Sequence, residues 1–309
     1  MKVTFLLNGE TVEVETPASQ TLLDWLRGTR GLTGTKEGCN EGDCGACSVI
    51  VTDETSKRAL NACILFMPQL HGKSVRTVEG IAGPNGEMHP VQSAMVDHHG
   101  SQCGFCTPGF IASMAAGHAN GRTDHDDMLA GNLCRCTGYA PILDAASKAC
   151  GNKAALKLDD SADVPLLKEI QRASTPTVNL EGDIIVQPVV RTRKGNEFVS
   201  PATLAEVADY LVKHPTSTLL AGSTEVGLQV NKQFSRPDHI VYLGNVVELK
   251  EVKDTPNAWH IGAVVSLTEV EGLVAKASRP LPNQLLAPNS YQNSNALVVE
   301  MYFLDSNNF

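Results

Sequence analysis

Cysteine forms the strongest chemical pattern in this sequence. The chain holds nine cysteines, all within its first 150 residues, and the first three have C-x4-C-x2-C spacing with a fourth shortly after them. This spacing is typical of a plant-type 2Fe–2S cluster, in which one tight loop supplies three thiolates and a neighbouring element supplies the fourth. The expected ligands are Cys39, Cys44, Cys47 and Cys63.

Three glycines are interleaved with these cysteines and strengthen the prediction. A loop that wraps a cluster needs positive φ angles and close backbone approach, which glycine supplies at low cost. Its amide N–H groups can then point at the negatively charged sulfur atoms, as they do in anion-binding loops. The glycines are Gly38, Gly42 and Gly45.

A second cysteine set follows, with C-x2-C and C-x-C spacing. We expect it to hold another 2Fe–2S cluster, because one residue between ligands suits a cluster iron better than a relaxed zinc tetrahedron. Zinc remains the alternative for both sets, although zinc knuckles usually pair two C-x2-C units. Cys150 is left over, and we expect a buried core thiol there. The second ligand set is Cys103, Cys106, Cys134 and Cys136.

Composition narrows the class of protein. The chain has 309 residues, 42% of them hydrophobic and 19% charged, which predicts a globular protein of two or three domains. The net charge of −9 disfavours nucleic acid and anionic membranes as partners. No apolar run reaches the roughly 18 residues of a membrane span. Clustered cysteines without an export signal favour a reducing, cytoplasmic location and argue against disulfides.

The elements around the first cysteine set predict a β-grasp ferredoxin domain over residues 1–78. Residues 2–7 and 10–15 have strand character and flank the hairpin signal Asn8-Gly9. A short helix over 21–28 precedes the cysteine loop. Strands are then expected over 48–52, 58–63 and near Val75.

Residues 79–152 predict a small bundle of four helices that carries the second cysteine set. Pro90 opens the first helix, and Thr107 is expected to cap the second with Pro108 behind it. Thr123 is expected to cap the third, and Pro141 opens the fourth. Each cysteine pair then lies just before a helix.

Three segments carry a family resemblance. Residues 37–47, 102–109 and 134–139 read EGCNEGDCGAC, QCGFCTPG and CRCTGY, and together they closely resemble the molybdenum hydroxylases, of which xanthine dehydrogenase is the best-known member. The resemblance implies that the second cluster lies nearest the molybdenum cofactor and that the first passes electrons to FAD. It also implies that Gln102 contacts the molybdopterin; the alternative is that Gln102 caps a loop.

A third unit is expected over residues 188–280, after a linker over 153–187. A helix over 204–211 precedes a buried strand and a glycine-containing turn that opens another helix, an arrangement that can hold phosphate on backbone N–H groups. The alternative is a glycine needed only for the turn. The resemblance implies an FAD diphosphate loop made of Leu219, Leu220, Ala221, Gly222, Ser223, Thr224, Glu225 and Val226.

The final segment, residues 281–309, departs from the family pattern. It is rich in Asn, Gln and Ser, ends without a helix or strand pattern, and lacks a second glycine-rich flavin motif. We therefore expect a truncated or frame-shifted product with an incomplete FAD-binding domain that binds FAD weakly or not at all. A natural short variant is the alternative. The predicted fold class is α+β multidomain: a β-grasp 2Fe–2S domain, a four-helix 2Fe–2S domain and an incomplete α+β FAD-binding domain of the PCMH type.

The expected function is that of the iron–sulfur/flavin subunit of a xanthine dehydrogenase-like enzyme. Electrons would pass from a molybdenum site through both clusters to FAD and NAD+, as hypoxanthine and xanthine become urate. No residue here has the pattern of a catalytic acid or base, so activity would require a molybdopterin-binding large subunit in a hetero-oligomer. The alternatives are a free-standing 2Fe–2S electron carrier and a zinc-binding interaction module. Other heterocycles and aldehydes remain open as substrates.

Overall fold

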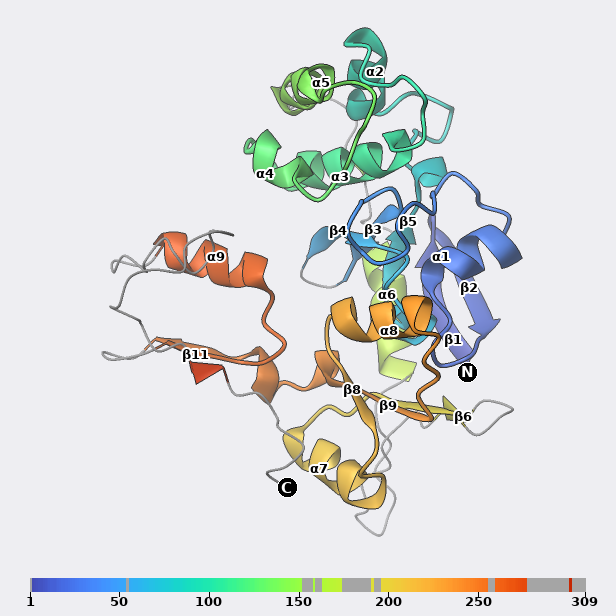
Figure 1. Ribbon diagram of the computed structural model, residues 1–309, viewed down its shortest axis with the longest axis vertical. Coiled ribbons are helices and arrows are strands. Elements are labelled where there is room, and N and C mark those ends of the chain that lie inside the picture. Colours follow the sequence, from blue (N-terminus) through green and yellow to red (C-terminus); the bar gives the residue numbers. More distant parts are fainter. Residues whose placement is uncertain are drawn as a thin grey trace.

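The computed structural model describes residues 2–53, 56–151, 158, 163–173, 190–191, 196–254, 259–276 and 300–301. These form an α+β multidomain fold, which confirms the predicted class. Figure 1 shows helices α2 to α5 at the top, a sheet with α1 in the middle, and a third unit below them. Within these ranges, no helix combines the length and the apolar character needed to cross a bilayer.

The N-terminal domain is a β-grasp. Its sheet has the order β2-β1-β5-β3-β4, with β1 parallel to β5 and the other neighbours antiparallel. Asn8 and Gly9 form the predicted turn with φ angles of 52° and 87°. Phe5, Leu22 and Leu26 are fully buried where the helical segment covers the sheet. The strands are β1 Lys2–Leu7, β2 Glu10–Glu15, β3 Ser48–Thr52, β4 Lys57–Asn61 and β5 Ser74–Arg76. The helical segments are α1 Leu22–Asp24, a π turn Trp25–Thr29, and 3-10 turns Met67–Leu70 and Val78–Gly80.

Four helices form the second domain, as predicted. They pack around Phe110, Met114 and Ile142, all of which are almost fully buried. Two caps differ by one residue from the prediction: Cys106 caps α3, and Asp124 caps α4. Differences of this size are ordinary at helix ends. The side chain of Cys150 lies outside the described residues. The helices are α2 Pro90–Asp97, α3 Thr107–Ala119, α4 His125–Leu129 and α5 Ala140–Gly151.

Glycines at the contact between the first two domains allow their backbones to approach closely. A Cβ on Gly109, in α3, would lie 2.1 Å from the carbonyl oxygen of Gly45, and a Cβ on Gly45 would lie 2.3 Å from the carbonyl oxygen of Gly131. Both distances are far below van der Waals contact, so the two backbones approach this closely only because the side chains are missing. Gly45 also has a φ of 68°, which favours glycine independently.

The third domain contains a four-stranded sheet of order β6-β7-β9-β8, in which β9 is parallel to β7 and β8. Thr203 and Glu206 form a capping box at the start of α7. The elements are β6 Val190–Arg191, β7 Glu197–Val199, α7 Leu204–Lys213, β8 Thr218–Leu220, α8 Thr224–Lys232 and β9 His239–Tyr242. After two 3-10 turns, Leu243–Asn245 and Glu248–Lys250, come β10 Val252–Asp254, β11 Trp259–Ile261, α9 Leu267–Lys276 and β12 Glu300–Met301.

Two expectations about irregular segments need correction. The predicted linker over 153–187 contains a helix, α6 Asp163–Ala173, because Leu167 is buried and Asp163 accepts a 2.8 Å hydrogen bond from Ser74. The segment 281–309 was expected to lack strands, but Glu300 and Met301 pair with β11 as β12. The remainder of that segment lies outside the described residues.

Replacing Gly109 with alanine tests the glycine contact. Alanine normally stabilises a helix interior by about 1 kcal/mol relative to glycine. Here we expect a net destabilisation of about 1–2 kcal/mol, because a Cβ would overlap backbone that cannot rotate away. The thermal unfolding midpoint of the cluster-loaded chain measures this. Gly131→Ala is the control, since a Cβ there meets no atom within 4 Å. Equal midpoints for the two variants would contradict the contact.

Candidate iron–sulfur and flavin sites

The first cysteine set forms one compact group of thiols. The amide of Cys39 donates to Sγ of Cys44 and the amide of Cys44 donates to Sγ of Cys39, each at 3.3 Å. Cys47 lies just before β3 and Cys63 just after β4, so the sheet positions the other two thiols. Cys63 interacts with both Cys47 and Cys39. The structure therefore brings all four predicted residues together.

The loop around this set uses positive φ angles at three positions. Gly42 and Gly45 have φ angles of 83° and 68°, as predicted, and the third position is Asn40 at 56°. Asparagine tolerates this region better than most residues. Gly38 serves a different purpose from the one expected: a Cβ there would lie only 2.7 Å from Sγ of Cys44. Its missing side chain leaves space for the sulfur.

Hydrogen bonds shift the pKa values of Cys47 and Cys63 in opposite directions. The Cys63 sulfur, acting as hydrogen-bond partner, lowers the pKa of Cys47. The same contact and burial raise the pKa of Cys63. Backbone N–H groups of Ala62 and Gly42 stabilise the thiolate forms of Cys47 and Cys63 respectively. Of this pair, Cys47 therefore has the environment that favours the thiolate, the form in which cysteine binds a metal.

The second set lies where α3 and α5 begin. The thiol of Cys103 pairs with that of Cys136, and the thiol of Cys106 pairs with that of Cys134. Cys103 and Cys136 are exposed, whereas Cys134 is buried. The structure thus gathers these four residues too, but close to the surface.

Neighbouring polar groups tune the second set. Burial acts to raise the pKa of Cys134, but hydrogen bonds from Thr137 and the backbone outweigh it and lower that pKa to about 7. Burial and the Cys134 thiol together raise the pKa of Cys106 to about 12. The Thr137 hydroxyl lies 3.1 Å from Sγ of Cys134, and the Cys134 amide donates to the Tyr139 hydroxyl at 3.0 Å. Four thiols in this setting fit the ligand requirement of an iron–sulfur cluster, and zinc accepts the same donors.

The two cysteine sets are joined directly. The amide of Leu133, next to Cys134 in the chain, donates to the carbonyl oxygen of Cys44 at 3.0 Å. Beside it, the buried Asn132 side chain donates to the carbonyl oxygen of Gly45 at 3.1 Å. One hydrogen bond therefore separates the backbone of a first-set cysteine from the residue before a second-set cysteine.

A large cavity of about 1340 Å³ lies between the first and third domains. Ala221, Gly222 and Thr224 of the predicted flavin loop line it. The other five loop residues do not: Leu220, for example, is buried in the sheet core, and Glu225 accepts a hydrogen bond from Gln229. The opposite wall includes Gly42, Ile64, Leu65 and Gln69 of the N-terminal domain.

The turn before α8 has features of a ligand-binding loop. Ser223 has a φ of 63°, is 3% exposed, and its hydroxyl has no hydrogen-bond partner within the described residues. A strained residue with an unpaired buried hydroxyl beside an open cavity fits a loop that receives a polar ligand. The residues present therefore fit an FAD diphosphate at the start of α8.

The far end of α8 contacts the first cysteine loop. The Asn231 side chain donates to the carbonyl oxygen of Cys63 at 2.7 Å, and the Lys232 ammonium donates to that of Cys39 at 2.5 Å. Gly227 allows the approach, because a Cβ there would lie 2.9 Å from Cβ of Ile64. Sequence reasoning missed these residues, since no local pattern marks them.

Gln102 is exposed beside the second cysteine set. Its side chain forms no hydrogen bond with any residue that the structure describes, so the loop-capping alternative has no support here.

Comparison with known proteins identifies the domains. Residues 5–67 match the family described as 2Fe-2S iron-sulfur cluster binding domain, residues 77–147 match the 2Fe-2S binding domain, and residues 193–294 match the FAD binding domain in molybdopterin dehydrogenase. The chain is 34% identical over 319 residues to xanthine dehydrogenase of Drosophila pseudoobscura pseudoobscura, covering 91% of this chain and 24% of that protein. It is 32% identical over 326 residues to aldehyde oxidase 1 of Bos taurus, with the same coverage of 91% and 24%.

The chain belongs to the molybdenum hydroxylase family. It carries two 2Fe–2S-binding domains and an FAD-binding domain, which confirms the predicted cofactor classes. This molybdenum hydroxylase chain spans about a quarter of the length of the curated relatives above, 24% in each case.

Two solved structures are similar in sequence over about half of this chain. Quinoline 2-oxidoreductase from Pseudomonas putida 86 is 33% identical, with a TM-score of 0.45 and coverage of 50% of this chain and 95% of that one. Aldehyde oxidoreductase from Desulfovibrio gigas is 36% identical, with a TM-score of 0.45 and coverage of 53% and 19%.

Proposed function

We propose that this chain is the iron–sulfur/flavin electron-transfer unit of a xanthine dehydrogenase-like molybdenum hydroxylase. In this proposal, Cys103, Cys106, Cys134 and Cys136 hold the cluster that receives electrons from a molybdopterin-binding partner. Cys39, Cys44, Cys47 and Cys63 hold the cluster that passes them to FAD and then NAD+. When bound, these groups supply the one- and two-electron redox chemistry, and the protein supplies position, burial and hydrogen bonds.

A continuous set of contacts carries the proposal. Leu133 bonds the second cysteine loop to Cys44 of the first at 3.0 Å, and Asn231 bonds the first set to α8 through Cys63 at 2.7 Å. Helix α8 begins at the residues that line the cavity. The second set, the first set and the flavin loop are thus connected in the order that electron transfer would need.

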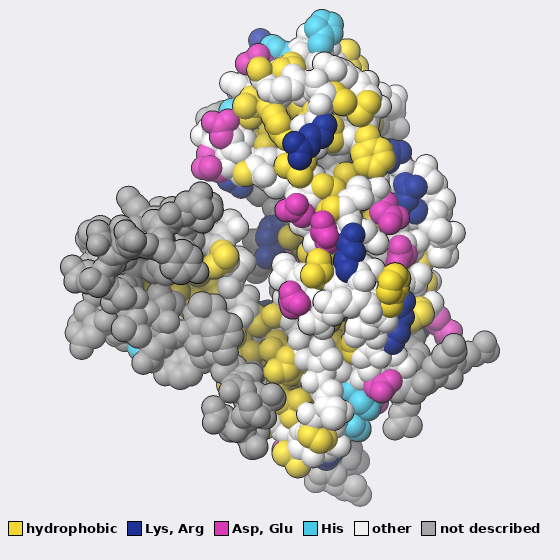
Figure 2. All heavy atoms as spheres, in the orientation of Figure 1, with side chains coloured by type: hydrophobic (Ala, Val, Ile, Leu, Met, Phe, Trp, Pro, Cys, Tyr) yellow, Lys and Arg dark blue, Asp and Glu magenta, His cyan; other side chains and the backbone are white. Residues whose placement is uncertain are grey.

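The surface at the second set supports its role as the entry point. Cys103, Cys136 and Gln102 are exposed there. Phe105 is 47% exposed and Leu133 is 38% exposed, which adds apolar area suited to a partner domain. In Figure 2, hydrophobic side chains gather over this helical domain. We propose that the molybdopterin-binding partner covers this surface in a hetero-oligomer and that Gln102 contacts the molybdopterin.

The FAD proposal rests on the start of α8. Backbone N–H groups at Gly222, Ser223 and Thr224 would hold the diphosphate, with the positive end of the helix dipole behind them. The first cysteine loop forms the opposite wall of the same cavity through Gly42. Flavin bound there would therefore lie beside the first cluster rather than the second.

The similarity to xanthine dehydrogenases supports purines as the substrate class. Hypoxanthine and xanthine would be oxidised to urate at the partner's molybdenum site, with NAD+ as the final acceptor. Aldehyde oxidases are also among the relatives, so an aldehyde is the alternative substrate that the experiment must distinguish from purines. Comparing xanthine and an aldehyde as electron donors to the assembled enzyme distinguishes the two.

Cysteine variants test the proposed order of electron transfer. The chain is loaded with iron, sulfide and FAD, and then reduced with NADH or dithionite. In contrast to the weak or absent FAD binding expected from the C-terminal sequence, wild type should show flavin absorbance and two distinct paramagnetic signals with either reductant. Cys106→Ser should lose the second-set signal, yet NADH should still reduce the first cluster. Cys44→Ser should keep a second-set signal with dithionite, while its reduction by NADH slows at least about tenfold.

The dithionite signal shows that the remaining cluster has formed, so it controls for misfolding. If NADH reduced the second cluster of Cys44→Ser as fast as in wild type, the proposed order would be wrong. Wild type with both clusters but no bound FAD would instead support a free-standing electron carrier. Zinc without iron would support a zinc-binding module.

A pair of substitutions at Gly222 tests the diphosphate position. A Cβ on Gly222 meets no atom within 4 Å, so a side chain can start there without a clash at its first carbon. Gly222→Asp should weaken FAD binding at least about tenfold relative to Gly222→Asn, because a carboxylate would repel the phosphates. The difference should shrink as salt rises. Equal FAD dissociation constants for the two variants, measured by flavin fluorescence, would place the diphosphate elsewhere.

A further inference from the structure

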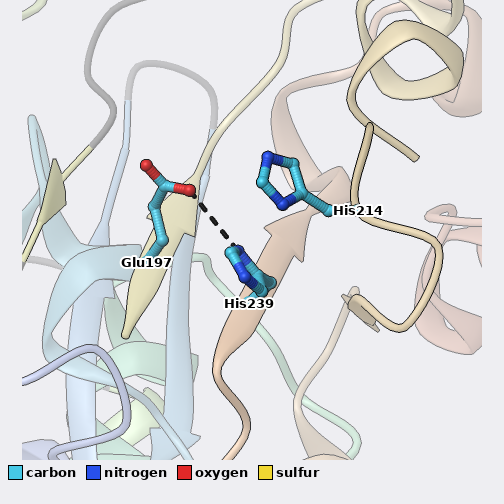
Figure 3. Close-up of side chains that lie close together, drawn as sticks. All are labelled: Glu197, His214 and His239. Atoms are coloured by element: carbon cyan, nitrogen blue, oxygen red, sulfur yellow. Dashed lines mark ion pairs between the residues drawn. The ribbon is translucent and has the colours of Figure 1, made fainter. Parts of the chain in front are cut away.

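The third domain contains a group of metal-binding side chains outside the proposed redox path. Glu197, His214 and His239 each offer one donor atom, and these atoms all lie within 4.8 Å of one another. Figure 3 shows Glu197 and His239 directed toward each other, with the His214 ring beside them. We propose that these three residues bind a divalent transition-metal ion of the zinc class.

The fold holds the three ligands on separate elements. Glu197 in β7 and His239 in β9 are directly paired in the parallel ladder, so their side chains leave the same face of the sheet. His214 follows the last turn of α7, where its amide donates to Tyr210 and its carbonyl oxygen accepts from the Ser217 hydroxyl at 2.7 Å. Bonds on both sides of His214 fix its backbone over the strand pair.

The donor chemistry and spacing suit zinc. Two histidines and one glutamate are a common protein ligand set for this ion, with water completing a tetrahedron. Nδ1 of His239 lies 3.4 Å from Oε2 of Glu197. In a tetrahedral zinc site with bonds of about 2.0–2.1 Å, two ligand atoms are separated by roughly 3.3–3.4 Å. This pair therefore already has the separation that the ion needs, and the donor atom of His214 lies within 4.8 Å of both.

Burial makes a cation favourable at this position. Glu197 is only 8% exposed, and a buried carboxylate needs compensation for lost solvation. The Tyr210 hydroxyl donates to Glu197 at 2.6 Å and lies 3.0 Å from Nδ1 of His239. A bound ion would add positive charge, and Tyr210 can retain a bond to the carboxylate as an outer contact.

The site lies on the side of the sheet away from the flavin cavity. Phe198 and Tyr242 line the cavity, whereas Val199 and Val241 pack toward α7. Because strand side chains alternate, Glu197 and His239 share the α7 side with Val199 and Val241. The ion would clamp α7 to β7 and β9 without contacting FAD, so the inference does not depend on the proposed function.

Zinc titration of the cluster-loaded full chain tests this proposal, since loaded clusters keep zinc away from the cysteines. Equilibrium dialysis with metal analysis should give one zinc per chain in addition to the cluster iron. Glu197→Gln, His214→Gln and His239→Gln should each weaken binding by more than the roughly 10–100-fold typical of losing an outer hydrogen bond. His260→Gln is the matched control, a partly buried histidine of the same domain in β11, and should bind as wild type does.

Tyr210→Phe separates a metal site from a simple hydrogen-bonded network. It removes the central donor of the network but keeps all three ligands, so zinc binding should stay within about tenfold of wild type. Zinc should also raise the thermal midpoint of wild type and Tyr210→Phe, but not of the ligand variants. Unchanged far-ultraviolet circular dichroism shows that each variant has folded, the third domain included. The proposal would be overturned if wild type bound no zinc. It would also be overturned if the three ligand variants bound zinc as tightly as wild type does.

Discussion

The hydrogen bond between the amide of Leu133 and the carbonyl oxygen of Cys44 is the constraint on which the rest of this structure depends. It forms only because the two domains approach with glycine on both sides, at Gly45 and Gly109. Any side chain at these positions would separate the backbones and lengthen the path between the two thiol groups. The distance between redox sites is thus set by packing rather than by the cysteines themselves.

Helix α8 extends the same constraint to the third domain. Its first turn belongs to the wall of the large cavity, and its last turn bonds the first cysteine loop through Asn231 and Lys232. A rigid helix that contacts a cofactor loop at one end and a cluster loop at the other fixes their separation. The proposed zinc site would stiffen the opposite side of the same sheet, where Glu197 in β7 and His239 in β9 face His214 at the end of α7.

Much of the fold and both thiol groups could be predicted from sequence, because the signals are local. Cysteine spacing and strand alternation operate within a few residues, and the fold class was confirmed by the structure and the family matches. The contacts of Asn231 could not be predicted, since its partner Cys63 lies 168 residues away. The helix α6 was missed because its burial depends on packing against another domain. Only three of the eight predicted flavin-loop residues line the cavity, since Leu219, Leu220 and Val226 pack against the hydrophobic cores of the third domain and Glu225 is exposed on α8.

Magnetic interaction between the two reduced clusters tests the central claim most directly. Electron paramagnetic resonance of the fully reduced chain at low temperature should show splitting of both signals, because clusters held by loops one hydrogen bond apart lie close enough to couple. Splitting that weakens in Gly109→Ala would link the coupling to the glycine contact. Two unsplit signals that add as independent spins in wild type would contradict the account, since the thiol groups would then be too far apart to form one path.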